Sequence, residues 1–420
     1  MAVPAKTRRV GILSATLLCA AATSALAQTT TTPSPPTRVV IDQVQLGDVK
    51  ANQQLTVVSA SGVSESATTV GNSAIGTADH AAVDYRATQE LNGDSLATAN
   101  VSVHDTAGDG LYVTSSATGN TGTAGTCCAA LTGSAVQTID AGHTVTAETD
   151  IYTGGPHSTG TISADAAAVG NTQGWETNGG SVNATSVQTH YGETYSALGA
   201  NVAAVDGVAS YSSTAVANNV TSDATDAPVT LMVSQTVDGL RTRGGIDVVQ
   251  QFGSDVVVAA TASANNINVT SNGFAASLTS DQSNASPVQA EVVNVNLAAW
   301  SGTATVSGYG VANSAIVSNA GPSTTANGTQ DNTGAVDATV NFTGGSGGYG
   351  GDSTVLATAV GNAYSAYACP DCNGTVSATL RQTNSGGVSA TSTSTITSSG
   401  YISGAASAVG NTATVQVHKN

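Results

Sequence analysis

The words AVGN at residues 168–171, 359–362 and 408–411 and TVGN at 69–72 belong to a repeat that decides the fold of this 420-residue chain. Their asparagine recurs at intervals of 47 to 51 residues. The positions are Asn72, Asn120, Asn171, Asn218, Asn265, Asn313, Asn362 and Asn411. A period of this length is typical of proteins whose repeats bury their faces by stacking on their neighbours.

A glutamine follows each of the first seven asparagines, 17 residues later in six copies and 20 residues later in the last. These residues are Gln89, Gln137, Gln188, Gln235, Gln282, Gln330 and Gln382. In stacked repeats, like residues lie ~4.8 Å apart, and each side-chain amide can donate to the next. We therefore expect one structural ladder of asparagines and one of glutamines.

Alternation around the asparagine predicts a β-strand. The residues one, three and five positions before it are Ala, Gly or Ser in every copy except at Thr69, and the residue two before is usually Val. A period of two places successive side chains on opposite faces of a strand. The small residues should thus line one face, and the valine and the asparagine should share the other.

The rest of each repeat predicts further strands. Turn residues such as those at 178–180 follow the asparagine, a second alternating strand leads to the glutamine, and a more variable stretch of 29 to 34 residues completes the repeat. The expected fold is an all-β β-solenoid, or β-helix, of eight repeats of about 48 residues. Each repeat would form one large coil or two coils of about 24 residues. A β-propeller has a similar period, but its Gly-His and Trp-Asp signatures are missing.

The N-terminus predicts export. Three basic residues precede an apolar run and the small-residue site at 25–27, so residues 1–27 read as a signal peptide. Leu18 precedes Cys19 where a lipoprotein needs a small residue, which disfavours lipidation. Residues 28–38 form a Thr/Pro linker, and residues 39–420 form the repetitive domain. We expect a secreted protein associated with the cell surface or outer membrane.

Composition excludes several partners. The formal charge is −17, only 9% of residues are charged, and aromatic residues make up 4%. An acidic chain poor in Lys and Arg cannot neutralise phosphates, so nucleic acids and anionic membranes are unsuitable partners. Few large side chains are available for a core, which must therefore be built from Ala and Val.

Candidate chemistry is sparse. Cys369 and Cys372 occupy the turn lengthened by three residues, and in an exported protein they predict a disulfide. Cys127 and Cys128 occupy the same turn of an earlier repeat; they pair with each other, stay free or cross-link to another chain. The six histidines share no phase of the repeat, and we identify no metal or cofactor site and no catalytic motif. The chain is expected not to be an enzyme.

The small-residue strands ending in Gly-Asn, with spaced glutamines, resemble the curlins of bacterial surface amyloid. The whole pattern, with AVGN copies, Gln188-Thr189 and a cysteine-bearing turn, resembles the holdfast attachment protein D family of stalked bacteria. The resemblance implies a cell-surface protein that anchors an adhesive polysaccharide, the holdfast, to the envelope. Its implied partners are outer-membrane secretion and anchor proteins.

Two functional questions stay open in the sequence. Open ends of a solenoid favour self-association, but a monomer and a filament are both compatible with the repeat. The alternative function is a secreted β-helical protein that binds or modifies carbohydrate. It requires aromatic and acidic side chains on one face, whereas Trp175 and Trp300 lie at different phases of the repeat. Regular Thr-X-Thr rows, typical of an ice-binding solenoid, occur only at 391–397.

Overall fold

The structure is a computed structural model that describes residues 36–155, 158–369 and 374–417. It is all-β, and every pair of adjacent strands within its two sheets is parallel. The first sheet, which we call the Gln sheet, has eight short strands: β1 (Thr37–Gln45), β3 (Val83–Leu91), β5 (Ala130–Ile139), β8 (Ser181–His190), β11 (Val229–Val237), β14 (Ala276–Asn284), β16 (Ser323–Asn332) and β19 (Thr375–Asn384).

The second sheet has two flanks. The Asn flank holds β7 (Thr161–Asn178), β10 (Ala209–Thr225), β13 (Val256–Asn272), β18 (Gly350–Ala368) and β21 (Ile402–Val417). The variable flank holds β6 (Thr144–Thr153), β9 (Glu193–Ala204), β12 (Arg241–Gly253), β17 (Val336–Gly344) and β20 (Val388–Ile396). Three long strands run through both flanks: β2 (Val49–Asp79), β4 (Ser95–Cys127) and β15 (Val288–Asn319).

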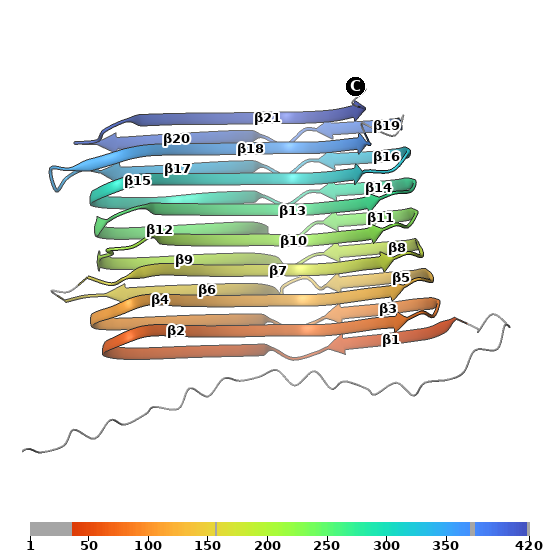
Figure 1. Cartoon of the computed structure of the whole chain (residues 1–420), viewed down its shortest axis with the longest axis horizontal. Coiled ribbons are helices and arrows are strands. Elements are labelled where there is room, and N and C mark those ends of the chain that lie inside the picture. Colours follow the sequence, from red (N-terminus) through yellow and green to blue (C-terminus); the bar gives the residue numbers. More distant parts are fainter. Residues whose placement is uncertain (1–35, 156–157, 370–373, 418–420) are drawn as a thin grey trace, which may run out of the picture. The chain divides into compact units, whose positions relative to one another are not determined.

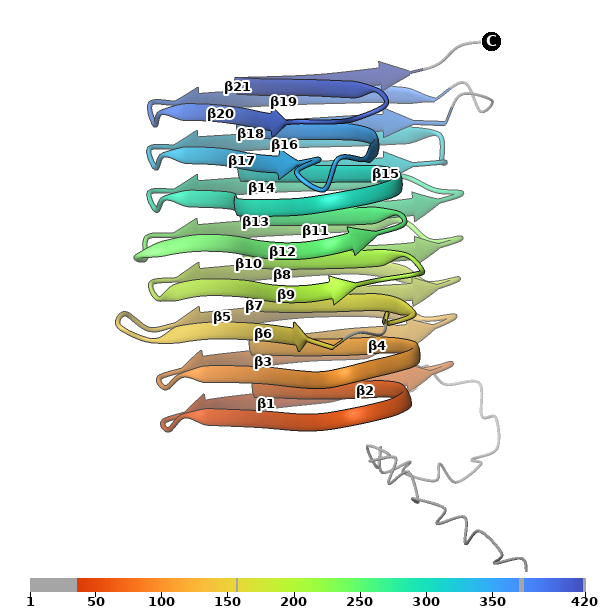
Figure 2. The same cartoon turned by 90° about the vertical axis from the view of Figure 1, so that its left-hand side faces the viewer.

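The described residues from Pro36 onward run in flattened passes. Each pass begins with a strand of the Gln sheet, continues in the variable flank, turns back and returns along the Asn flank (Figures 1 and 2). We number the passes 1 to 8 from β1 to β19. The strand β1 starts at Thr37, two residues before the boundary expected from the sequence.

Register shows that one repeat makes one pass. Asn72 pairs with Asn120 and Asn171 pairs with Asn218 on adjacent parallel strands. Gln89 likewise pairs with Gln137. Two coils per repeat would place an intervening strand between these residues, so that alternative is wrong. Parallel pairing between successive repeats also contradicts the propeller, whose four-stranded blades do not stack on one another in register.

Two cores fill the space between the layers. One lies between the variable and Asn flanks and includes Leu111, Val145 and Leu198. The other lies between the Gln sheet and the Asn flank and includes Tyr85 and Trp175. The asparagines sit where each Asn-flank strand passes from the first core to the second, since Ala117 belongs to one and Ala124 to the other.

The expected face of the asparagine is corrected by the structure. In β7 the buried residues alternate up to Gly170, and then Gly170 and Asn171 are both buried. The alternation is therefore shifted by one residue at the asparagine. Asn171 points inward together with the small residues, while Val169 on the other face is only half-buried. The residue before the asparagine is glycine or alanine in every copy. At Gly170 even a Cβ would lie 2.4 Å from the carbonyl oxygen of Ala217 and 2.5 Å from His190 Cδ2, so this pass requires glycine.

No helix long and apolar enough to cross a bilayer occurs in the described ranges.

Candidate functional site

The asparagines form one continuous ladder through the stack. Each Nδ2 donates to Oδ1 of the asparagine in the next pass, from Asn72 to Asn411, over 2.7 to 3.0 Å. The six inner members, from Asn120 to Asn362, are fully buried. From Asn72 to Asn362, Nδ2 also donates to a backbone carbonyl of the Gln sheet, as Asn218 does to Thr236 over 3.0 Å.

The glutamines form a second ladder that faces the first. Each Nε2 donates to Oε1 of the glutamine in the preceding pass, from Gln382 back to Gln43, over 2.7 to 3.0 Å. Each Nε2 also donates to the carbonyl directly after the asparagine, as Gln235 does to Asn266. Each glutamine thus donates beside the asparagine of its own pass, and each asparagine donates beside the glutamine of the next pass. The asparagine contact is kept at Asn362, which donates to Thr383, although the spacing to Gln382 is 20 there.

The two ladders have opposite polarity. Asparagine donors point toward pass 8, whereas glutamine donors point toward pass 1. A row of aligned amide dipoles has a net dipole along the stack, and two opposed rows reduce it. The spacing of the asparagines and glutamines in the sequence predicts neither the direction of the ladders nor their hydrogen bonds to the backbone of the opposite layer.

Sequence analysis missed a third ladder. Asn284 donates to Asn332 over 2.8 Å and Asn332 donates to Asn384 over 2.7 Å. Each of these residues also donates to the carbonyl two positions later, where the Gln sheet gives way to the variable flank. The signal was present in the sequence, because each lies two residues after a ladder glutamine.

The first and last passes leave complementary groups without ladder partners in the described residues. Among the described residues, Nδ2 of Asn411 donates no hydrogen bond and Oε1 of Gln382 accepts none. At the other end, Oδ1 of Asn72 accepts no hydrogen bond from the residues that the structure describes, and Gln43 donates to Ser73 alone among them. One end thus presents an asparagine donor and a glutamine acceptor, and the other end presents their counterparts.

Two adjacent turns, after β2 and after β4, bring together residues that the sequence analysis treated separately. Asp79 pairs with Cys127 in register, and His80 and Cys128 are the residues that follow them. A ring nitrogen of His80 and both thiol sulfurs lie within 4.8 Å of one another. Sequence analysis identified no metal site and did not bring these three residues together. The sequence does contain a signal for this cluster, because His80 and Cys128 occupy the same position of the repeat. Each lies eight residues after a ladder asparagine.

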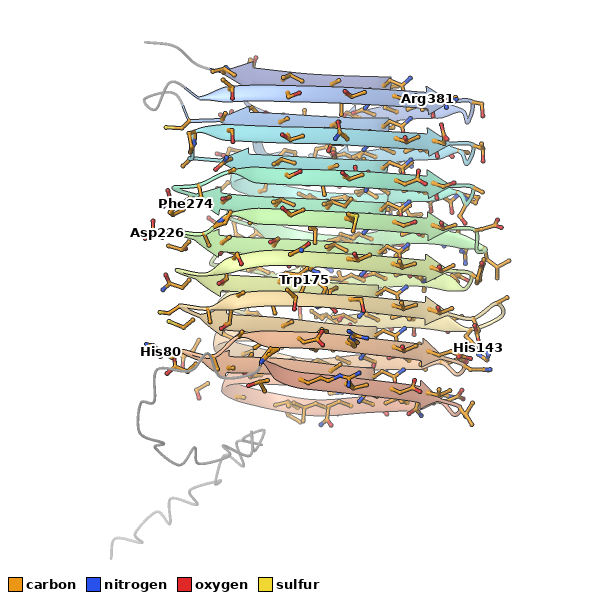
Figure 3. All side chains as sticks on the ribbon, turned by 90° about the vertical axis from the view of Figure 1, so that its right-hand side faces the viewer. His80, His143, Trp175, Asp226, Phe274 and Arg381 are labelled. Atoms are coloured by element: carbon orange, nitrogen blue, oxygen red, sulfur yellow. The ribbon has the colours of Figure 1, made fainter. Side chains whose placement is uncertain are left out.

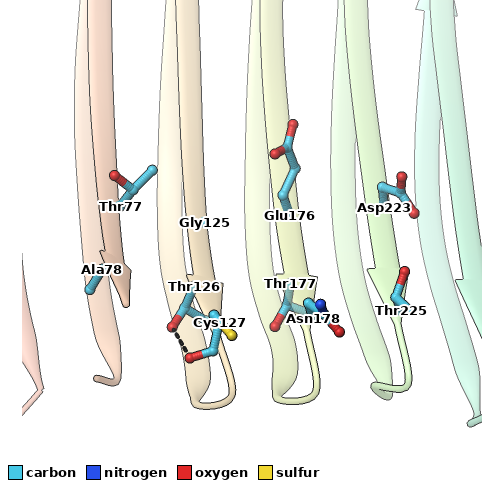
Figure 4. A pocket seen from close by; sticks show the side chains of 10 residues that line it. All are labelled: Thr77, Ala78, Gly125, Thr126, Cys127, Glu176, Thr177, Asn178, Asp223 and Thr225. Atoms are coloured by element: carbon cyan, nitrogen blue, oxygen red, sulfur yellow. Dashed lines mark hydrogen bonds between the residues drawn. The ribbon is translucent and has the colours of Figure 1, made fainter. Parts of the chain in front are cut away.

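These turns lie at an edge of the stack, where Figure 3 shows His80, Asp226 and Phe274, with His143 at the opposite edge. The two sulfurs are 2.6 Å apart, and both cysteines are free. The hydrogen bond to the Cys128 thiol raises the pKa of Cys127 to about 11. Beside the turns lies a hollow of about 380 Å³, lined by Cys127, Glu176 and Asp223 among others (Figure 4).

The structure describes only one of the two cysteines of the predicted disulfide between Cys369 and Cys372. Cys369 takes part in a disulfide bond. Cys372 lies outside the described residues, so its pairing with Cys369 stays a prediction.

The outer surface of the variable flank has two neighbouring hollows that share Asp150 and Ile151. Exposed Tyr152 lines the first, together with Asn100 and Ser102, and its ring lies 6.3 Å from that of His104. Asn201 and Asp247 line the second. Burial raises the pKa of Asp150. An aromatic ring among amide, hydroxyl and carboxyl groups is suited to polyhydroxylated ligands.

Both tryptophans are fully buried and cannot serve as exposed stacking platforms. Trp175 packs edge-on against Tyr85 at 5.7 Å and donates to Oγ of Ser186 over 2.8 Å. Trp300 packs against Phe342 at 5.6 Å and donates to the carbonyl of Asp352. They stabilise the two cores.

Comparison with protein families matches residues 57–335 to Holdfast attachment protein D. The chain belongs to this family. The match runs from β2 to the residue before β17 and so covers most of the ladder region. Membership implies a role in holdfast attachment and a location at the cell surface. No curated protein and no solved structure matches the chain.

Proposed function

We propose that this holdfast attachment protein is a β-solenoid of eight coils, one per pass, that anchors an adhesive polysaccharide to the bacterial envelope after export. The family match over residues 57–335 is the observation that carries the anchoring role. The structure supports it mechanically: each inner pass is joined to its neighbours by parallel backbone pairing and by two amide ladders.

The ladders suit a protein that bears load. Pulling the layers apart at one pass breaks two lateral amide bonds and leaves buried polar groups unpaired, at a cost of about 1–3 kcal/mol for each group. The same loss is repeated at every pass, because the bonds recur along the stack. The anchor therefore resists shear between its layers by many small, buried contacts.

The proposed polysaccharide contact is the pair of hollows around Tyr152 on the variable flank. Ordered amide and carboxyl groups there can hydrogen-bond sugar hydroxyls, and the exposed ring can stack on a sugar face. Outer-membrane secretion and anchor proteins remain the proposed envelope partners. We propose no enzymatic step, cofactor or nucleic-acid partner, because attachment requires binding alone.

Gene deletion tests the anchoring role. Cells without the protein should still make the adhesive but shed it, and the wild-type gene should restore retention. Asp150→Ala with Tyr152→Ala should fail to restore retention, whereas Tyr309→Ala, which removes another exposed tyrosine, should restore it. Unchanged attachment after deletion would contradict the anchor proposal. Normal retention by the double variant would instead reject only the proposed contact surface.

The alternative, a secreted protein that binds or modifies carbohydrate, uses the same surface but differs in the deletion test. A secreted binding protein could be added from outside to restore retention, whereas an anchor must be exported by the cell that carries it. Soluble product released from purified polysaccharide would favour an enzyme.

A further inference from the structure

We propose that two adjacent turns, the one after β2 and the one after β4, form a zinc site in which His80, Cys127 and Cys128 bind one Zn²⁺ ion. The ion would tie the first pass to the second at the end of the stack. This inference is independent of the polysaccharide contact, because the residues lie on a different edge.

Convergence of the ligand atoms is the first argument. Two sulfurs and one imidazole nitrogen lie within 4.8 Å of one another. Zinc binds sulfur at about 2.3 Å and nitrogen at about 2.0 Å, so its ligands in a tetrahedral site lie roughly 3.3–3.8 Å apart. The two sulfurs, 2.6 Å apart, must separate by roughly 1 Å to reach that spacing. The His80 side chain is 72% exposed and has room to rotate toward them.

The arrangement also supplies an orienting group. Oδ1 of Asp79 lies 2.7 Å from Nδ1 of His80. A carboxylate on one ring nitrogen commonly fixes the tautomer of a metal-binding histidine and leaves the other nitrogen for the ion. Water or the Asp79 carboxylate can complete the fourth position.

Backbone geometry fixes where two of the ligands lie. His80 and Cys128 have positive φ angles of 55° and 64°, and Asp226, Gly179 and Gly273 share this conformation at the same position of other passes. The turn itself therefore sets this conformation, and it places His80 beside Cys128. The two turns are held by bonds from His80 N to Cys127 O and from Cys128 N to Asn178 O, at 3.1 and 2.6 Å. The Thr126 hydroxyl donates to the carbonyl of Ala81 across the two passes.

The chemistry favours a thiophilic cation. Two thiolates and an imidazole are ligands of zinc and not of calcium or magnesium, which prefer oxygen. On binding, each thiol releases its proton to solvent and forms a Zn–S bond, and no redox step is involved.

The test uses the mature full chain with Cys369→Ser and Cys372→Ser, so that only two thiols remain. After reduction, a thiol count of two and removal of metal, Zn²⁺ is added, and bound zinc and affinity are measured by competition with a chromophoric chelator. We expect one zinc per chain and a higher melting temperature. His80→Asn, which tolerates positive φ, should weaken binding at least tenfold, and Cys128→Ser should weaken it further.

His143→Asn is the matched control, since His143 also lies beside a carboxylate, with 3.7 Å from Nδ1 to Asp94 Oδ1, but has no cysteine partner in the described residues. It should bind zinc like the parent. Circular dichroism establishes that each variant is folded. A folded, reduced parent that binds no stoichiometric zinc would overturn the proposal. Equal affinity in His80→Asn and the parent would overturn it as well.

Discussion

At the residue scale, the buried amides are the most sensitive positions of the fold. Asn218 accepts from Asn171 and donates to Asn265 and to the carbonyl of Thr236. Leucine would fill the space but satisfy none of these groups. Because each orphaned buried group costs about 1–3 kcal/mol, we expect Asn218→Leu to lower the free energy of unfolding by about 3 kcal/mol or more.

Urea unfolding followed by circular dichroism measures this loss. Asn201→Leu is the control, because Asn201 is exposed on β9 and outside the ladders. Its effect should stay within about 0.5 kcal/mol. Equal stability of both variants would show that the ladder contributes nothing to stability.

His190 makes a second residue-scale prediction, about pH. It lies fully buried between Ile139 and Val237 of adjacent strands, and Nε2 is 2.8 Å from Oγ1 of Thr194. Desolvation lowers the pKa of His190 from 6.5 to about 4. Between these two values the unfolded chain binds a proton that the folded chain does not. The stability that comes from keeping His190 neutral is therefore fully present above pH 6.5 and is lost as the pH falls to 4.

This loss amounts to about 3 kcal/mol at pH 4, from the free energy equivalent of the pKa difference. His190→Ile, which copies the residue of the neighbouring pass, should abolish it. Unfolding of the wild type and the variant is compared at pH 7 and pH 4. The difference in free energy of unfolding between the wild type and His190→Ile should change by about 3 kcal/mol between pH 7 and pH 4. A difference that is independent of pH would contradict the assignment.

At the element scale, the junction between the Gln sheet and the variable flank depends on a glycine that tolerates no side chain. A Cβ on Gly386 would lie 1.9 Å from the carbonyl oxygen of Gly334, whereas a Cβ on Gly387 has nothing within 4 Å. We expect Gly386→Ala to destabilise the protein by about 2 kcal/mol and Gly387→Ala to have little effect. Thermal unfolding of the two neighbouring variants measures the difference, and equal melting temperatures would refute the close approach.

The elements also show how far sequence reasoning reaches. The period and the residue types were enough to predict the all-β class and the pairs of side-chain amides that contact each other. Stacking places equivalent residues of successive repeats side by side. The inward turn of Asn171 was not predictable from alternation, since it depends on the strand passing from one core to the other. The cluster of His80 with Cys127 and Cys128 was missed because the histidines were compared with one another and not with the cysteines of the next repeat.

At the scale of the whole molecule, the ends of the stack predict head-to-tail assembly. The free donor of Asn411 matches the free acceptor of Asn72 in a second copy, and Gln43 matches Gln382 in the same way. Asn411→Asp keeps the acceptor used by Asn362 but replaces the outward donor with a charge. It should reduce assembly strongly.

Light scattering over a range of protein concentrations measures this assembly. Asn268→Asp, the same change at an exposed position in β13, should assemble like the wild type. A wild type that stays monomeric at all concentrations would contradict the prediction, as would normal assembly of Asn411→Asp.

The central claim is that each repeat is one pass stacked in register. Pulsed electron paramagnetic resonance tests it with nitroxide labels on outward positions of one column, in a chain whose native cysteines are serine. Ser66 and Ser307 are five register steps apart, and Ser66 and Ala405 are seven. We predict backbone separations of roughly 24 and 34 Å, at ~4.8 Å per step. Separations twice as large, or a second distance no longer than the first, would contradict the fold.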